Sequence, residues 1–423
     1  MFFKLFQKEC MQTGKSLIYL IYILCVWIFF FSQMGSPNFE KLKAPVQGQE
    51  ESYGTVYSKE PHQIMEYTLG SLTKNYLHNS WTTYPIGFAK YVTLSEQEKS
   101  EIDQILVETT GLSEKEREAE IEKFYANKEK ENAQGLTRIE TRSFFLKPVQ
   151  GLSYQEFQKQ MEKVCKILGP GSEYEEEVYS KGVSVPATYE QALEDYENFI
   201  EKDKISGGYA RLFCDYMGII LGVMPVFVAV TRCMRDRRSQ MKDLIYVRKA
   251  SSWSIVWSRY VAMVVMMLLP VLLASCITLG QCLGYGAGNG ISVNIWAFIP
   301  YVFGWLLPEI MIVSAVGMCL TELTDTALAI LVQGIWWFAD IFASAGNLSG
   351  GQYGFHLVPR NNSVRGYELF RDSFQQLVLN RIAYSIFAIL LIILCVGIYE
   401  VKRKGKWDIY GKIHSYCKRK QKA

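Results

Sequence analysis

The segment Tyr260–Leu283 has the sequence YVAMVVMMLLPVLLASCITLGQCL and contains no charged residue in 24 positions. A membrane-spanning helix needs about 20 mostly apolar residues, so this segment is long enough to cross a bilayer. In soluble proteins the apolar residues usually recur with a period of 2 or 3.6 instead of filling such a block. The segment therefore predicts an integral membrane protein.

Five further apolar segments occur along the 423-residue chain. The first covers about Leu17–Phe31, and the other four cover residues 209–230, 294–320, 326–345 and 379–399. Together the six segments predict an α-helical polytopic membrane protein with six transmembrane helices. The expected organisation is a cytosolic amino terminus with the first span (1–33), an inserted domain (34–207), a five-helix region (208–399) and a basic tail (400–423).

The first apolar segment also has the basic flank and length of a secretory signal peptide. The residues that follow it, 32–35 with the sequence SQMG, are a poor cleavage site because they lack the small-x-small pattern. We therefore expect this segment to remain as an uncleaved anchor.

Residues 34–207 differ from the rest of the chain in charge. They contain 20 basic and 30 acidic residues, whereas the remainder contains 25 basic and 12 acidic residues. Three Ser-x-x-Glu sequences, at 95–98, 113–116 and 153–156, predict helix starts with capping boxes. Residues 141–149 predict a strand, and residues 188–204 predict a helix that leads to the membrane. We expect an α+β domain without an internal disulfide, because Cys165 is its one cysteine.

Basic residues lie beside the apolar segments and predict their orientation. The amino terminus, the loop 231–259 and the tail 400–423 are all rich in Lys and Arg. Six spans place all three on one side, and the positive-inside rule makes that side the cytoplasm. The acidic domain is then extracellular. Because the basic residues flank spans, a nucleic-acid partner is not expected.

Polar side chains occur inside the predicted spans, among them those of Asp215, Glu309, Gln333 and Asp340. A charge at the centre of a span costs about 2.5–3.5 kcal/mol on insertion scales, so such groups need a wet or protein-lined environment. One interpretation is that they line a substrate path or a subunit interface. The other is that they form buried pairs, such as Arg211 with Asp215.

Motifs that resemble nucleotide-binding or catalytic sites are incomplete. Gly14-Lys15-Ser16 matches the end of a Walker A loop, but the required earlier glycine is replaced by Glu9. The sequence LSGGQ at 348–352 matches the signature of ATP-binding-cassette ATPases, but no Walker A motif accompanies it. The four histidines form no His-Glu-x-x-His motif, and no Gly-x-Ser-x-Gly sequence occurs. We expect no enzyme activity, bound metal or cofactor in this chain.

The loop 231–259 alternates charged and apolar residues at roughly helical spacing. This pattern predicts a pair of amphipathic helices at the membrane surface. It is equally compatible with a docking element for a cytosolic partner, since one face of such a helix can contact lipid while another contacts protein.

The whole pattern resembles the ABC-2 type transporter permeases, in particular those with a large extracellular domain between the first two spans. The resemblance is carried by three stretches: residues 237–270, residues 317–337 with their short turn between spans, and the semi-polar segment 346–377. In the family the first stretch contains the coupling helix that contacts the ATPase, and the third contains partly re-entrant helices on the outer side. Carried over, the ATPase-docking residues are Arg237, Arg238, Met241, Asp243, Leu244, Arg248 and Trp253.

The resemblance further implies a half-transporter that pairs with a second copy or a sister permease. Separate ATPase subunits would bind ATP and Mg²⁺, and the second and fifth spans would line the path. Most such proteins are bacterial cell-membrane exporters of peptides, antibiotics or lipid-linked molecules. Two alternatives stay open: a receptor or secretion accessory protein like the phage-infection proteins, and a membrane enzyme that uses the outer domain.

Overall fold

The computed structural model describes residues 2–35, 39–49, 53–85, 90–133, 143–180, 182–247, 249–344, 351 and 353–405. The chain folds into two compact units. One consists of residues 1–43 and 195–423, and the other consists of residues 44–194. Each unit has its own hydrophobic core.

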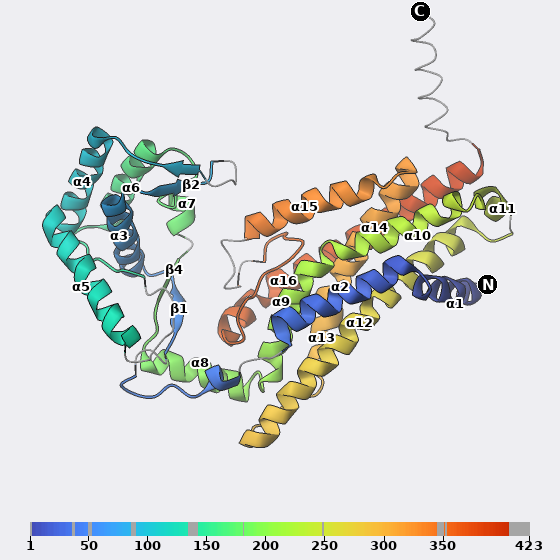
Figure 1. Ribbon diagram of the computed structural model, residues 1–423, viewed down its shortest axis with the longest axis horizontal. Helices are drawn as coiled ribbons and strands as arrows, with labels where there is room; N and C mark the ends of the chain where they lie inside the picture. Colours follow the sequence, from blue (N-terminus) through green and yellow to red (C-terminus); the bar gives the residue numbers. More distant parts are fainter. Residues whose placement is uncertain are drawn as a thin grey trace, which may run out of the picture. The chain divides into compact units, whose positions relative to one another are not determined.

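The unit 44–194 is mainly helical with two small antiparallel sheets (Figure 1). Its helices are α3 (Pro61–His78), α4 (Glu96–Thr110), α5 (Glu114–Ala133), α6 (Tyr154–Leu168) and α7 (Glu176–Tyr179). Strand β1 (Thr55–Ser58) pairs with β4 (Val183–Pro186), and β2 (Trp81–Thr83) pairs with β3 (Lys90–Val92). The unit lies within the predicted domain 34–207, and its extracellular location stays a prediction.

The core of this unit follows the apolar faces of its helices. On α6 the side chains of Phe157, Met161 and Val164 are fully buried, as their helical spacing predicted. The predicted strand over 141–149 is wrong for residues 143–149, which form no strand. Their backbone bonds go to helices instead, since Leu146 N donates to Glu66 O and Val149 N donates to Thr109 O.

Two of the predicted capping boxes are complete in the structure. Ser95 accepts a bond from Glu98 N, and Glu98 Oε2 accepts one from Ser95 N at 2.9 Å. Ser153 and Glu156 repeat this arrangement at the start of α6. At the third predicted box, Glu116 Oε2 accepts a bond from Ser113 N at 2.8 Å.

These caps lead to a pH-dependent prediction. The serine hydroxyl and backbone N–H stabilise the ionised carboxylate, so the pKa values of Glu98 and Glu156 are lowered. Their contribution to stability is therefore complete above the ordinary glutamate pKa of about 4.3 and is lost as the pH falls through the lowered values. We expect Ser95→Ala with Ser153→Ala to destabilise fragment 44–194 at pH 7, by about 1 kcal/mol for each cap.

Circular dichroism during heating at pH 7 and at pH 3 measures this effect. The difference between variant and wild type should shrink at the lower pH. Ser100→Ala, an exposed substitution within α4, is the control and removes no cap. A pH-independent difference would contradict the assignment.

The other unit is a bundle of long helices (Figure 1). Its amino-terminal helices are α1 (Phe2–Gly14) and α2 (Leu17–Met34), and α8 (Tyr189–Glu201) joins the two units along the chain. The remaining helices are α9 (Ser206–Leu221), α10 (Met224–Arg238), α11 (Lys242–Tyr246), α12 (Ser252–Asn289), α13 (Phe298–Tyr301), α14 (Leu307–Thr324), α15 (Leu328–Ser344) and α16 (Tyr367–Arg403). A π-helical turn, Val302–Leu306, joins α13 to α14.

Four helical segments among the described residues are long and apolar enough to cross a membrane: α2, α12, Phe298–Thr324 and α16. The pair α9 and α10, bent by 44°, forms a fifth if it is one span. The chain is therefore a multi-pass membrane protein. Four or five of the six predicted spans thus correspond to candidate membrane-spanning helices, and the full set of six, with the 17-residue α15 as the sixth, stays a prediction.

Several element boundaries differ from the sequence prediction. The helix α10 continues to Arg238 and α12 already begins at Ser252, so most of the predicted loop 231–259 belongs to these helices. Between α10 and α12 the described residues form only the short α11, so the predicted pair of amphipathic helices is wrong. The early start of α12 has a local cause, since Ser251 caps it by accepting a bond from Ser254 N. Similarly, α16 begins at Tyr367, inside the predicted re-entrant segment.

Candidate functional site

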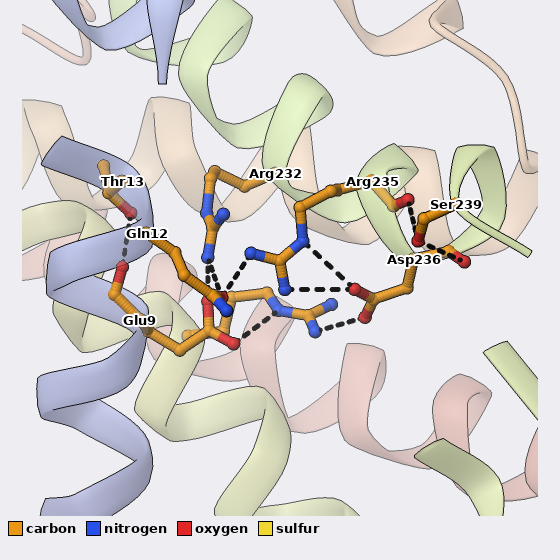
Figure 2. Close-up of polar contacts among 8 residues, drawn as sticks. Glu9, Gln12, Thr13, Arg232, Arg235, Asp236 and Ser239 are labelled. Atoms are coloured by element: carbon orange, nitrogen blue, oxygen red, sulfur yellow. Dashed lines mark hydrogen bonds and ion pairs between the residues drawn. The ribbon is translucent and has the colours of Figure 1, made fainter. Parts of the chain in front are cut away.

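An ionic network joins α1, α10 and α12 close to the carboxyl end of α10 (Figure 2). We call its six residues the arginine cluster: Glu9, Gln12, Arg232, Arg235, Asp236 and Arg259. Arg232 is paired with Glu9, and Arg259 Nη2 lies 2.6 Å from Asp236 Oδ2. Arg235 contacts both Gln12 and Asp236. Three guanidinium groups thus share two carboxylates and one amide.

The arginine cluster fixes the helix α1 to the rest of the bundle. Arg232 and Arg259 are nearly fully buried, with exposed fractions of 3% and 4%. Such charges need close partners, and α1 supplies one of them through Glu9. The helix α1 also packs along α12, where Gly14 lies against Met266. Sequence reasoning missed this contact, because it considered Glu9 only as the residue that breaks the Walker A pattern.

The loop 239–251 follows directly and is held by the end of α16. Arg403 donates from Nε to Tyr246 O at 2.8 Å and from Nη1 to Ala250 O at 2.6 Å. Glu400 accepts a bond from Ser252, and the rings of Tyr246 and Tyr399 are in edge contact at 5.4 Å. Two carbonyls of the loop are therefore held by α16, although several of its side chains are exposed.

Most of the predicted docking residues lie on or beside this loop. Met241, Leu244 and Trp253 are exposed by 42%, 56% and 51%. Val247, which was not among the predicted docking residues, is exposed by 80%. Arg238 is also exposed.

The other three predicted docking residues are placed differently. Arg237 donates to the carbonyl of Asp325 at the end of α14. Arg248 and the side chain of Asp243 lie outside the described residues. Their assignment to docking, like that of the residues above, stays a prediction.

A second polar region surrounds the segment 353–366, which precedes α16. Its backbone is irregular, yet Tyr353, Leu357 and Val358 are fully buried. Asp340 on α15 accepts bonds from Leu357 N and Val358 N, both at 2.9 Å. Irregular backbone at membrane depth requires such partners, because lipid cannot satisfy its N–H and C=O groups.

Side chains of α9 and α16 complete the contacts of this segment. Asp215 pairs with Arg360 at 2.8 Å and accepts a bond from Asn361 N at 2.6 Å. Arg381 donates to the carbonyls of His356 and Leu357 at 3.1 and 3.0 Å. The segment is thus attached to three helices, α9, α15 and α16, by charged side chains.

Glu309 on α14 has an unusual environment. Its side chain is fully buried, and Arg381 Nη1 lies 3.5 Å from its Oε2 atom. Neither carboxylate oxygen has a hydrogen-bond partner within the described part of the chain. The side chain faces the end of α9, since a Cβ atom at Gly218 in α9 or at its C-cap residue Gly222 would lie 3.3 Å from a carboxylate oxygen of Glu309. A buried carboxyl group, with Arg381 as its one cation within 4 Å among the described residues, therefore lies at the contact of three helices.

The structure places all four predicted path residues inside the bundle. Asp215, Glu309 and Gln333 have no exposed surface, and Asp340 is 9% exposed. Gln333 donates to the carbonyl of Gly222 at 2.7 Å. Asp215, Gln333 and Asp340 thus form hydrogen bonds or ion pairs within the same chain. The carboxylate of Glu309 has no hydrogen bond among the described residues. Their role in a substrate path or subunit interface stays a prediction.

The alternative pairing of Arg211 with Asp215 is wrong. Arg211 forms a two-pronged pair with Asp203 at 2.5 and 2.6 Å, whereas Asp215 pairs with Arg360. Sequence reasoning also missed Arg381. The sequence nevertheless indicated its importance, because a cation within the apolar segment 379–399 needs a buried partner.

The chain matches a known family of membrane proteins. The family model described as ABC-2 family transporter protein matches residues 15–395, which is most of the chain. No curated protein matches the chain, and no solved structure does.

Proposed function

The chain belongs to the ABC-2 family of transporter proteins, and from this premise we propose that it is the permease subunit of an ATP-binding-cassette transporter. Separate ATPase subunits bind ATP and Mg²⁺ and dock on loop 239–251. The permease pairs with a second copy or a sister subunit in the bacterial cell membrane. Both chain ends lie in the cytoplasm, and the unit 44–194 lies outside.

The observation that carries the docking proposal is the exposure of apolar side chains on a backbone that is itself held in place. Leu244 and Val247 are exposed by 56% and 80%, although both belong to a loop bonded to α16. Exposed apolar side chains surrounded by charge are typical of protein-binding surfaces. The neighbouring Arg238 adds a cationic rim.

The position of the loop supports the same proposal. It joins α10 to α12 directly, and α16 and the arginine cluster hold its flanks. A force on the loop is therefore applied to four helices of the bundle, including α1. This arrangement suits a protein whose source of energy is a separate chain.

We propose that transport is export of a peptide, antibiotic or lipid-like molecule, as in most ABC-2 exporters. The path would run beside α9, α10 and α15, with Glu309 as the polar group that has no hydrogen bond within the described part of the chain. The acidic character of residues 34–207 would favour a cationic substrate at the outer side.

Purification of the intact complex tests the docking proposal. We expect the full-length chain to retain a cytosolic ATPase, detected as vanadate-sensitive ATP hydrolysis in the purified sample and as a Walker A protein by mass spectrometry. Leu244→Asp with Val247→Asp should lower the retained activity about tenfold or more, since a central apolar anchor contributes about 2 kcal/mol to an interface. Arg238→Glu should weaken retention less.

Tyr91→Asp, which changes an exposed residue of the unit 44–194, is the matched control and should leave retention unchanged. Unchanged retention in the double variant would mean that docking occurs elsewhere. A wild-type chain that retains no ATPase would contradict the permease proposal and favour a receptor or accessory function.

A further inference from the structure

The helix α16 contacts both the loop 239–251 and the segment 353–366. It runs without interruption from Tyr367 to Arg403. Residues 376–384 contact the segment 353–366, and residues 399–403 contact the loop 239–251. From Arg381 to Arg403 an α-helix rises by about 33 Å, which is about the thickness of the hydrocarbon core of a bilayer.

At one end, Arg403 holds both sides of the loop. It donates to the carbonyls of Tyr246 and Ala250, which lie four residues apart. These carbonyls lie at the end of α11 and just before the N-cap of α12. Because one planar guanidinium binds both, the loop cannot shift relative to α16 without breaking a charge-assisted bond.

At the other end, four polar side chains of α16 hold the segment. Asn380 donates to the carbonyls of Gly354 and His356 at 2.8 and 2.9 Å. Tyr384 donates to Phe355 O at 2.6 Å. Arg381 donates to His356 O and Leu357 O. Gln376 accepts a bond from Tyr353 N. Each of the five residues 353–357 thus has one backbone group bonded to this helix.

Between these ends α16 is packed rather than free. Ala388, Ile392 and Cys395 are fully buried, and α14 lies along the helix (Figure 1). Neither proline nor a break in the hydrogen-bonding pattern interrupts the helix, so no hinge of the usual kind separates the two ends. A displacement of one end along the helix axis is therefore carried to the other.

We infer that Arg403 is a positioning residue that attaches the ATPase-docking loop to α16, and that α16 carries the movement of this loop to the segment 353–366. The inference rests on the proposed function, since the ATPase supplies the movement. The loop is joined covalently to α10 and α12, but in the described part of the chain neither of these helices binds the backbone of residues 353–357. That backbone is bound by α16.

Amide hydrogen exchange of the intact complex in lipid nanodiscs tests the inference. The full-length chain with its co-purified ATPase is compared with and without ATP plus vanadate, and peptides that cover residues 242–252 and 353–358 are followed. In the wild type we expect ATP plus vanadate to change the exchange of both peptides. Arg403→Ala should reduce the response of 353–358 at least about fivefold, the low end of usual coupling between sites.

Three further variants distinguish coupling from a structural defect. Lys404→Ala removes a neighbouring charge that pairs only with Glu400 among the described partners, and its response should equal the wild type. Arg403→Lys should keep part of the response, because an ammonium group still donates to these carbonyls. Tyr384→Phe, which acts at the far end, should reduce the response of 353–358 while ATPase retention and melting temperature stay unchanged.

The failures of the two proposals are distinguishable. A wild-type chain without an ATPase overturns the proposed function. A complex that binds the ATPase but shows no response at 353–358 overturns the inference alone. So does an equal response at 353–358 in the wild type and in Arg403→Ala.

Discussion

Replacing Arg381 with methionine is expected to destabilise the protein by about 3–5 kcal/mol, the usual cost of removing one partner of a buried ion pair. Arg381 is 4% exposed, and it is the only cation within 4 Å of Glu309 among the described residues. The variant leaves Glu309 buried without a counter-ion. It also leaves the carbonyls of His356 and Leu357 without their guanidinium donor.

The melting temperature of the full-length protein in detergent measures this loss. The double variant Arg381→Met with Glu309→Gln should melt above the single variant, because the uncompensated charge is removed. Arg371→Ala is the control, since this arginine of α16 is exposed and its ion pairs lie at the surface. If the double variant were no more stable than Arg381→Met, Glu309 and Arg381 would not be energetically coupled.

The second large effect is expected at Gly208 in α9. A Cβ atom at this position would lie 2.2 Å from the carbonyl oxygen of Val364 and 2.8 Å from the ring of Phe199. The carbonyl belongs to the backbone of the segment 353–366, so the segment or the helix must move. We expect Gly208→Ala to destabilise the protein by about 1–3 kcal/mol or more, as overpacking usually does.

Gly280→Ala is the matched control within α12. Apart from the backbone of α12 around it, no described atom lies within 4 Å of a Cβ atom there, so the substitution should stabilise the helix by about 0.5–1 kcal/mol. Melting temperatures in the same detergent should therefore shift in opposite directions. Equal melting temperatures for both variants would contradict the close approach of α9 to the segment 353–366.

Sequence reasoning succeeded where the cause is local. The capping boxes at Ser95 and Ser153 were predictable because donor and acceptor lie three residues apart. The helix α12 was predictable because its apolar residues form one block, although its start depended on the cap at Ser251. The family was recognisable for a related reason, since the order of apolar segments and their basic flanks can be read from one sequence.

The candidate site was predicted only in part. Buried polar residues such as Asp215 and Asp340 were identified, because a charge in an apolar segment is conspicuous. Their partners were not, since Asp215 is 145 positions from Arg360 and Glu9 is 223 positions from Arg232. Several cations were available to each carboxylate, and nothing local selects among them.

The amino-acid sequence by itself determined that this chain crosses a membrane several times, carries a separate acidic domain and belongs with the ABC-2 transporters. These properties follow from the free energy of transfer into lipid and from net charge, which depend on which residues are present in each stretch. Only the tertiary structure decided which charges meet, that Arg403 holds both sides of the loop, and that Arg381 serves Glu309 and the segment 353–366 together. Such pairings require particular helices to lie side by side, and that is decided by packing over the whole bundle.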